Sequence, residues 1–120
     1  MKTYVAELMQ SRTQAHVYHL QTDSYSKHEA LQDYYEDIVP LVDEIVEAYQ
    51  GKYGKIMNYP EPTPIKNMQE NEDILAYFDK FAKFINLKRV DLPKDGFLEH
   101  KFDEVDTLIR STIYKLRFLK

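Results

Sequence analysis

Hydrophobic residues recur every three or four positions along most of the chain, which is the period of an amphipathic α-helix. Segments with this pattern cover about residues 3–20, 27–51, 72–87 and 97–119. The positions that carry the pattern include Val5, Leu8, Met9, Leu31, Tyr34, Ile38, Val42, Ile45, Ile74, Phe78, Phe81, Ile85, Phe102, Val105, Ile109 and Leu116. The pattern therefore predicts four helices.

Local signals place the ends of the second helix. Ser26 and Glu29 have the S-x-x-E spacing, in which a serine oxygen and a glutamate satisfy each other's free backbone amides at a helix start. Gly51 predicts its end. Pro40 lies inside the helix and predicts a kink, because proline has no N–H and crowds the preceding turn. Residues 51–70 hold two glycines and three prolines, which predicts a long connection between helices two and three.

Length and composition limit the possible fold classes. The chain has 120 residues, of which 43% are hydrophobic and 30% are charged. This is the size of one domain, so we expect a single helical domain over residues 1–120. Four amphipathic helices with a long middle connection predict an all-α four-helix bundle.

Charge and residue usage exclude several function classes. The net charge is −4, and no lysine-rich tail is present, which argues against DNA binding through bulk charge. The absence of cysteine excludes disulfides and thiolate metal sites. No segment approaches the roughly 18 apolar residues of a membrane span. We therefore expect a cytoplasmic protein that binds no membrane.

Histidines and carboxylates form the candidate chemistry. His16, His19 and His28 flank the predicted bend between the first two helices. Asp43 and Glu47 are four residues apart, which places both carboxylates on one helix face. Two imidazoles with two carboxylates suit Fe(II) or Zn(II) better than Mg²⁺ or Ca²⁺. For each histidine the alternative is a packed side chain with a satisfied hydrogen bond, and for His19 packing is the favoured interpretation.

The spacing of these residues requires more than one subunit if one metal uses all four. Asp43 follows His28 by 15 residues, a separation of about 22 Å along a helix that a kink cannot close. His16 and His28, in contrast, flank the same bend. The histidines would then come from one subunit and the carboxylates from another, across a two-fold axis. The sequence thus predicts a homo-oligomer that is at least a dimer.

The segment HVYHLQTDSYSKHEALQDYYEDIVPLVDEIVEAY resembles the metal-binding half of the Dps family, the mini-ferritins. The similarity runs without a gap over about residues 15–50. It implies a ferritin-like bundle in which His16, His28, Asp43 and Glu47 are the ligands of a ferroxidase site shared between subunits. It further implies oxidation of Fe(II) by peroxide or oxygen, iron storage or peroxide protection, and a shell of usually twelve subunits.

The chain also departs from that family. It is shorter than a usual Dps subunit, and Val17 stands where the family has tryptophan after the first histidine. The family's basic N-terminal tail is missing, which argues against DNA coating. A dimer is the smaller alternative to the shell. The alternative function is a non-catalytic helical dimer that acts as an interaction module, with or without a structural metal.

Overall fold

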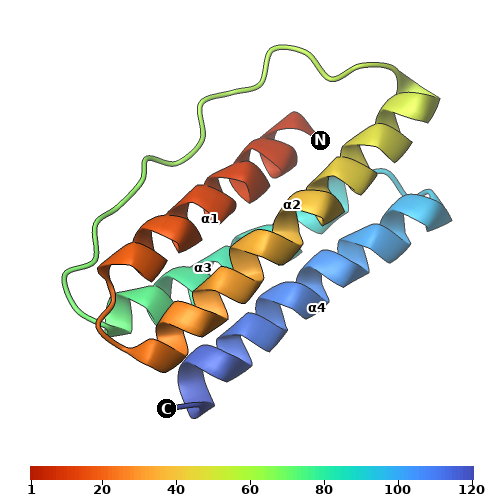
Figure 1. Ribbon diagram of the computed structural model, residues 1–120. Coiled ribbons are helices and arrows are strands. Elements are labelled where there is room, and N and C mark those ends of the chain that lie inside the picture. The colour runs from red at the N-terminus through yellow and green to blue at the C-terminus, as the bar shows by residue number, and fades with distance from the viewer.

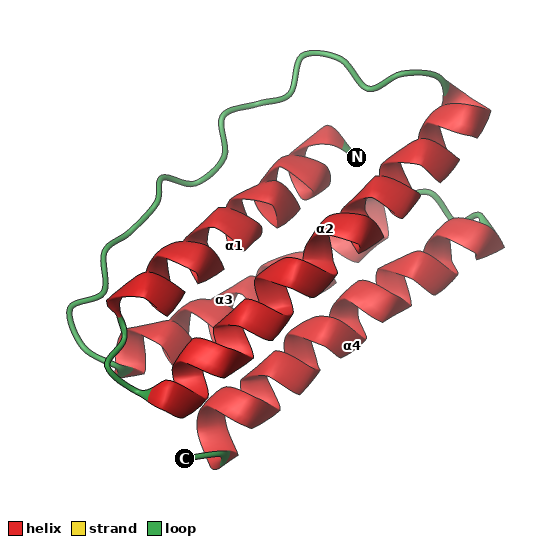
Figure 2. Ribbon diagram, in the orientation of Figure 1, coloured by secondary structure: helices red, strands yellow, loops and turns green.

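The computed structural model describes residues 1–120 and is built from α-helices. These are α1 (Lys2–Gln21), α2 (Tyr25–Tyr53), α3 (Glu72–Lys88) and α4 (Gly96–Phe118), with a short 3-10 turn, η1 (Arg89–Asp91), between the last two. They pack side by side into an elongated bundle of 44 × 25 × 22 Å (Figure 1). The secondary structure consists of helices and loops without strands (Figure 2), which confirms the all-α bundle. None of the helices is both long and apolar enough to cross a membrane.

The lengths of the loops decide which neighbouring helices run antiparallel and which run parallel. α1 lies antiparallel to α2, and α3 lies antiparallel to α4, while α2 packs on α4 across the bundle (Figure 1). α1 and α3 make few contacts with each other. Because residues 54–71 traverse the length of the molecule before α3 begins, α2 and α3 run in the same direction.

The ends of α2 differ from the sequence prediction. The helix begins at Tyr25, and its N-cap is Ser24, whose hydroxyl accepts a hydrogen bond from the Lys27 amide at 3.4 Å. The prediction of a cap at Ser26 was wrong because Ser26 lies two residues after the actual cap and is already part of the first helical turn. Gly51 does not end the helix either. The end comes at Gly54, whose φ of +92° is a backbone conformation that favours glycine.

Pro40 lies within α2, and the helix continues through it without a break. Proline cannot donate the helical hydrogen bond to the carbonyl of Glu36. Both Pro40 and Glu36 are exposed, so water can reach that carbonyl. The position of Pro40 on the solvent side explains why the helix tolerates it.

The core is a single cluster of 21 buried apolar side chains contributed by all four helices and Leu92. Edge-to-face aromatic pairs join the helices, with Tyr4 against Phe102 at 5.3 Å between ring centroids and Tyr34 against Phe78 at 5.0 Å. Such pairs add stability beyond the burial of their area. The core therefore ties the α1–α2 pair to the α3–α4 pair.

One buried polar chain lies within this core. The Ser11 hydroxyl donates to the Leu8 carbonyl at 2.6 Å, so the Tyr34 hydroxyl, 2.7 Å away, is the donor to Ser11. Burial raises the pKa of the Tyr34 hydroxyl, which keeps it protonated as this donor. The hydrogen bond joins the middle of α1 to the first half of α2.

The segment between α2 and α3 is held against α1 by side chains spaced seven residues apart. The Glu7 carboxylate accepts the Thr63 amide at 2.8 Å. Gln14 bonds both backbone groups of Lys66, accepting from its N–H at 2.8 Å and donating to its C=O at 2.9 Å. Gln21 accepts the Met68 amide at 2.7 Å. A spacing of seven keeps the three side chains near one helix face, so one stripe of α1 binds the segment over most of the length of that helix.

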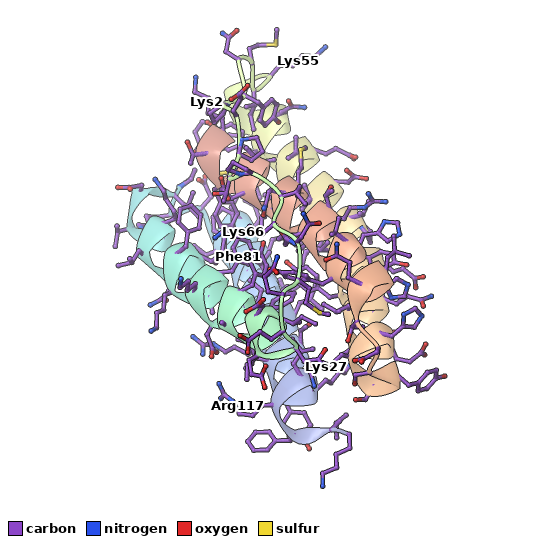
Figure 3. The ribbon with its side chains drawn as sticks, turned by 90° about the vertical axis from the view of Figure 1, so that its left-hand side faces the viewer. Lys2, Lys27, Lys55, Lys66, Phe81 and Arg117 are labelled. Carbon is purple, nitrogen blue, oxygen red and sulfur yellow. The ribbon has the colours of Figure 1, made fainter.

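The backbone of this segment is extended where it is bound. Pro60, Pro62 and Pro64 favour extended conformations in themselves and in the residues before them. Figure 3 shows the segment passing from Lys55 at one end of the bundle to Lys66 alongside the helices. The segment covers the side of the bundle where α1 and α3 make few contacts.

Candidate functional site

The bend between α1 and α2 brings His19 and His28 into direct contact. Their rings stack with centroids 3.6 Å apart and planes 20° apart. Each ring also bonds the backbone of the other residue: His19 Nδ1 lies 2.8 Å from the His28 carbonyl, and His28 Nδ1 lies 2.9 Å from the His19 carbonyl. The pair therefore closes the bend with two reciprocal hydrogen bonds.

These hydrogen bonds fix the tautomer of both rings. A carbonyl oxygen is only an acceptor, so Nδ1 must carry the proton in each histidine. In a neutral imidazole with its proton on Nδ1, Nε2 holds the free lone pair. This is the arrangement in which an imidazole is oriented as a metal ligand by a backbone carbonyl. His28 is thus held with the lone pair of Nε2 available as an electron-pair donor.

His16 lies beside this pair, one turn earlier on α1. Its ring stacks on Tyr35 at 4.5 Å, and its centroid is 6.0 Å from that of His19. Tyr35 also meets His19 edge to face at 5.3 Å. His16 and His28 are partly buried, whereas His19 is only 7% exposed. We call His16, His19 and His28 the imidazole cluster.

Asp43 and Glu47 lie elsewhere on the same chain. Both carboxylates are exposed, on consecutive turns of α2, and neither forms an ion pair within 4 Å. Asp43 borders a shallow groove of about 260 Å³ between α1 and α2, together with Met9, Arg12 and Val39. The groove lies farther along the pair of helices than the imidazole cluster.

Within one subunit, the structure brings the histidines together and leaves the carboxylates apart from them. His28 and Asp43 both belong to the continuous helix α2, so they are about 22 Å apart along its axis. No group of three or more histidine, aspartate or glutamate side chains in this chain is placed to hold a metal ion. A four-ligand site therefore requires a second subunit.

Two members of this region were not assigned a role at the site from the sequence. His19 was interpreted as packing, and its burial agrees with that, but its carbonyl also orients His28. For Tyr35 the sequence favoured packing, with electron transfer from an iron site as the alternative; in the structure its ring covers one face of His16. The three-residue spacing of His16 and His19 and the seven-residue spacing of His28 and Tyr35 are the signals that place them on facing stripes of the two helices.

The fold and this region define an all-helical bundle protein with an imidazole cluster at the bend between its first two helices. The chain belongs to the family described as "Family of unknown function (DUF5856)", which matches residues 19–116. The match includes His28, Asp43 and Glu47, and His16 lies just before it. Searches of curated proteins and of solved structures found no significant match.

Proposed function

We propose that this protein is a Dps-like, ferritin-like iron-binding oligomer that oxidises Fe(II) at sites shared between two subunits. His16 and His28 of one subunit and Asp43 and Glu47 of the next are the proposed ligands. Iron is the substrate in this proposal. Two Fe(II) ions give up one electron each, and hydrogen peroxide accepts both electrons with two protons to yield two water molecules, or oxygen accepts them to yield hydrogen peroxide. The protein would serve iron storage or protection against peroxide.

The observation that carries the proposal is the fixed tautomer of His28. Its Nδ1 donates to the His19 carbonyl at 2.9 Å, which leaves Nε2 as an electron-pair donor. His28 is only partly buried, so this lone pair can be reached from outside the subunit, whereas His19, which has the same tautomer, is only 7% exposed. Neutral imidazole and carboxylate together form a donor set suited to Fe(II).

Helix geometry supports sharing across a two-fold axis. At 100° per residue, the direction of Asp43 on α2 lies about 60° from that of His28, and Val39 lies between them. Val39 and Met9 are apolar but 41% and 48% exposed. A second α1–α2 pair, packed antiparallel over these residues, would bring the carboxylates of each subunit toward the imidazole cluster of the other.

The topology is also compatible with a ferritin-like bundle. Helix α2 is joined to α3 by residues 54–71, which span the bundle so that the two helices run parallel. One long crossover of this kind is typical of ferritin-like folds. This likeness rests on the arrangement of helices and is part of the proposal.

Fe(II) oxidation tests the proposal directly. Anaerobic Fe(II) is added to the protein, peroxide is then added, and the rise of ferric absorbance is followed. Asp43→Asn removes a charge with little change in shape, so it should lower Fe(II) affinity and the initial rate at least tenfold, in line with the loss of a ligand-shell interaction. Asp37→Asn is the matched control, because Asp37 is also exposed on α2 but points about 120° away from Asp43 round the helix axis. It should leave both the Fe(II) affinity and the initial rate unchanged.

Histidine variants provide a second matched pair. His28→Ala should reduce Fe(II) binding and oxidation, whereas His100→Ala should not, because His100 is exposed on α4. Since His28 also closes the bend, unfolding of each variant is measured in urea so that loss of iron oxidation is compared at equal folded fraction. Equal activity of the two variants would contradict the proposal.

A mixed-subunit experiment separates a shared site from a site within one chain. One variant carries His16→Ala and His28→Ala, and the other carries Asp43→Asn and Glu47→Gln. Each mixed dimer would regain one intact ligand set and keep one empty set. Recovery of oxidation on mixing supports the shared site, and no recovery in confirmed mixed dimers refutes it. A strict monomer at micromolar concentration, by light scattering, would also refute it.

One observation favours the second candidate, a non-catalytic helical dimer. Tyr35 stacks on His16 at 4.5 Å, which gives that histidine a packing role without metal, and the exposed Met9 and Val39 suit an apolar interface. In that case the dimer would form equally well with and without Fe(II), and Asp43→Asn would change neither iron oxidation nor assembly. The Fe(II) experiment and light scattering distinguish the two functions.

A further inference from the structure

A second region lies on α3 and α4, away from the imidazole cluster. There a groove of about 570 Å³ is bordered by side chains from both helices, including Lys83, Arg110, Tyr114, Arg117 and Phe118. Arg117 lies near the carboxyl end of α4 (Figure 3). We call this region the α3–α4 groove. Its volume is within the range of about 300–1,000 Å³ of sites that bind small molecules.

The groove is positively charged although the whole chain carries a net charge of −4. Three cationic side chains border it, and Asp79 is the only carboxylate there. Arg117 pairs with Asp79 through two contacts, at 3.1 and 3.3 Å. Lys83 and Arg110 form no ion pair within 4 Å. Two cations in one groove are therefore left for an anion.

Two exposed aromatic rings stand beside these cations. Tyr114 is 56% exposed and Phe118 is 64% exposed. They are one helical turn apart on α4, with ring centroids separated by 5.5 Å and planes inclined at 45°. Exposed rings beside arginine and lysine form a surface on which a planar aromatic group can stack while its anionic part meets the cations.

We propose that the α3–α4 groove binds a free nucleoside phosphate. The base stacks on Tyr114 or Phe118, and the phosphates are held by Lys83 and Arg110, with Arg117 beside them. A free nucleotide fits better than a long nucleic-acid strand for two reasons. The groove has the volume of a small-molecule site, and a strand leaving the groove would meet an acidic protein that repels phosphates. This site is independent of iron binding.

The test uses calorimetric titration of the full chain, without added metal, with ATP, tripolyphosphate and adenosine. Tripolyphosphate presents the charge without the base, and adenosine presents the base without the charge. We expect ATP to bind about tenfold more tightly than either, because stacking and charge both contribute. Equal affinity for ATP and tripolyphosphate would overturn the stacking role, and equal affinity for ATP and adenosine would overturn the phosphate role.

Variants locate the binding. Lys83→Gln combined with Arg110→Gln should weaken ATP binding at least tenfold, and Tyr114→Ala combined with Phe118→Ala should reduce it to the tripolyphosphate level. Lys55→Gln and Tyr25→Ala are the controls, because both residues are exposed outside the groove and should leave affinity unchanged. Helical content by circular dichroism confirms that each variant is folded. Insensitivity to the groove variants, or tighter binding of a thymidine oligonucleotide than of ATP, would refute the proposal.

Discussion

Gln14 is expected to be the strongest single attachment of the segment that joins α2 to α3. Its side chain is fully buried, and it forms two hydrogen bonds to the backbone of Lys66, of 2.8 and 2.9 Å. A typical neutral hydrogen bond contributes about 0.5–1.5 kcal/mol to stability. Because Lys66 is exposed, its backbone groups can bond to water after the change. Gln14→Ala should therefore lower the free energy of unfolding by about 1–3 kcal/mol.

Two related variants separate the effect of burial from the effect of the hydrogen bonds. Gln14→Glu keeps an acceptor for the Lys66 amide but has no donor for its carbonyl, and it places a charge in a buried position. It should therefore destabilise at least as much as Gln14→Ala. Gln21 bonds the same segment from an exposed position, so Gln21→Ala should cost less than about 1 kcal/mol.

Urea unfolding followed by circular dichroism measures these differences, and amide hydrogen exchange reports on the segment itself. In the Gln14→Ala protein the Lys66 amide should lose its protection while amides in the middle of α2 and α4 keep theirs. If Gln14→Ala and Gln21→Ala were equally stable and the Lys66 amide exchanged at the same rate in both, the two hydrogen bonds of Gln14 would not hold the segment, and the reasoning would be refuted.

Further predictions concern the core and the start of α3. The Tyr4 hydroxyl is buried without a hydrogen-bond partner, so Tyr4→Phe should leave the free energy of unfolding unchanged or raise it. Tyr34→Phe removes the hydrogen bond to Ser11 and should lower the free energy of unfolding in urea by about 1 kcal/mol. A larger loss for Tyr4→Phe than for Tyr34→Phe would contradict this prediction. The amides of Glu70 and Gln69 bond the Asp73 carboxylate and lower its pKa below the usual 3.8. Its contribution to stability is therefore complete above pH 3.8 and is lost as the pH falls through the lower pKa of the folded state. The stability difference between the native chain and Asp73→Ala should be constant near neutral pH and shrink only in acid; a difference that persists at the lowest pH at which the protein stays folded would be evidence against it.

The sequence by itself determined the helices and their buried faces. Residues such as Leu31, Tyr34 and Ile38 recur at the helical period, and burial of a continuous apolar stripe is a local property that the order of residues encodes directly. The separation of His28 from Asp43 was likewise predictable, because both lie on one helix and the rise per residue is constant.

Details of the helix ends were less predictable. Ser24 and Ser26 both precede the helical pattern, and the S-x-x-E spacing to Glu29 favours Ser26 as the cap. Which one caps α2 depends on where the chain leaves α1, and that is decided by the closure of the bend through His19 and His28. The cap is thus selected by a contact between two helices, which no local pattern contains.

Only the tertiary structure decided the contacts between residues far apart in the chain. The bonds from Gln14 to Lys66 join residues 52 positions apart, and the α3–α4 groove combines Lys83 with Arg110. In sequence these are ordinary polar residues on amphipathic helices. Their roles arise because packing of the core sets the rotation of each helix about its axis, and that rotation determines which side chains face one another.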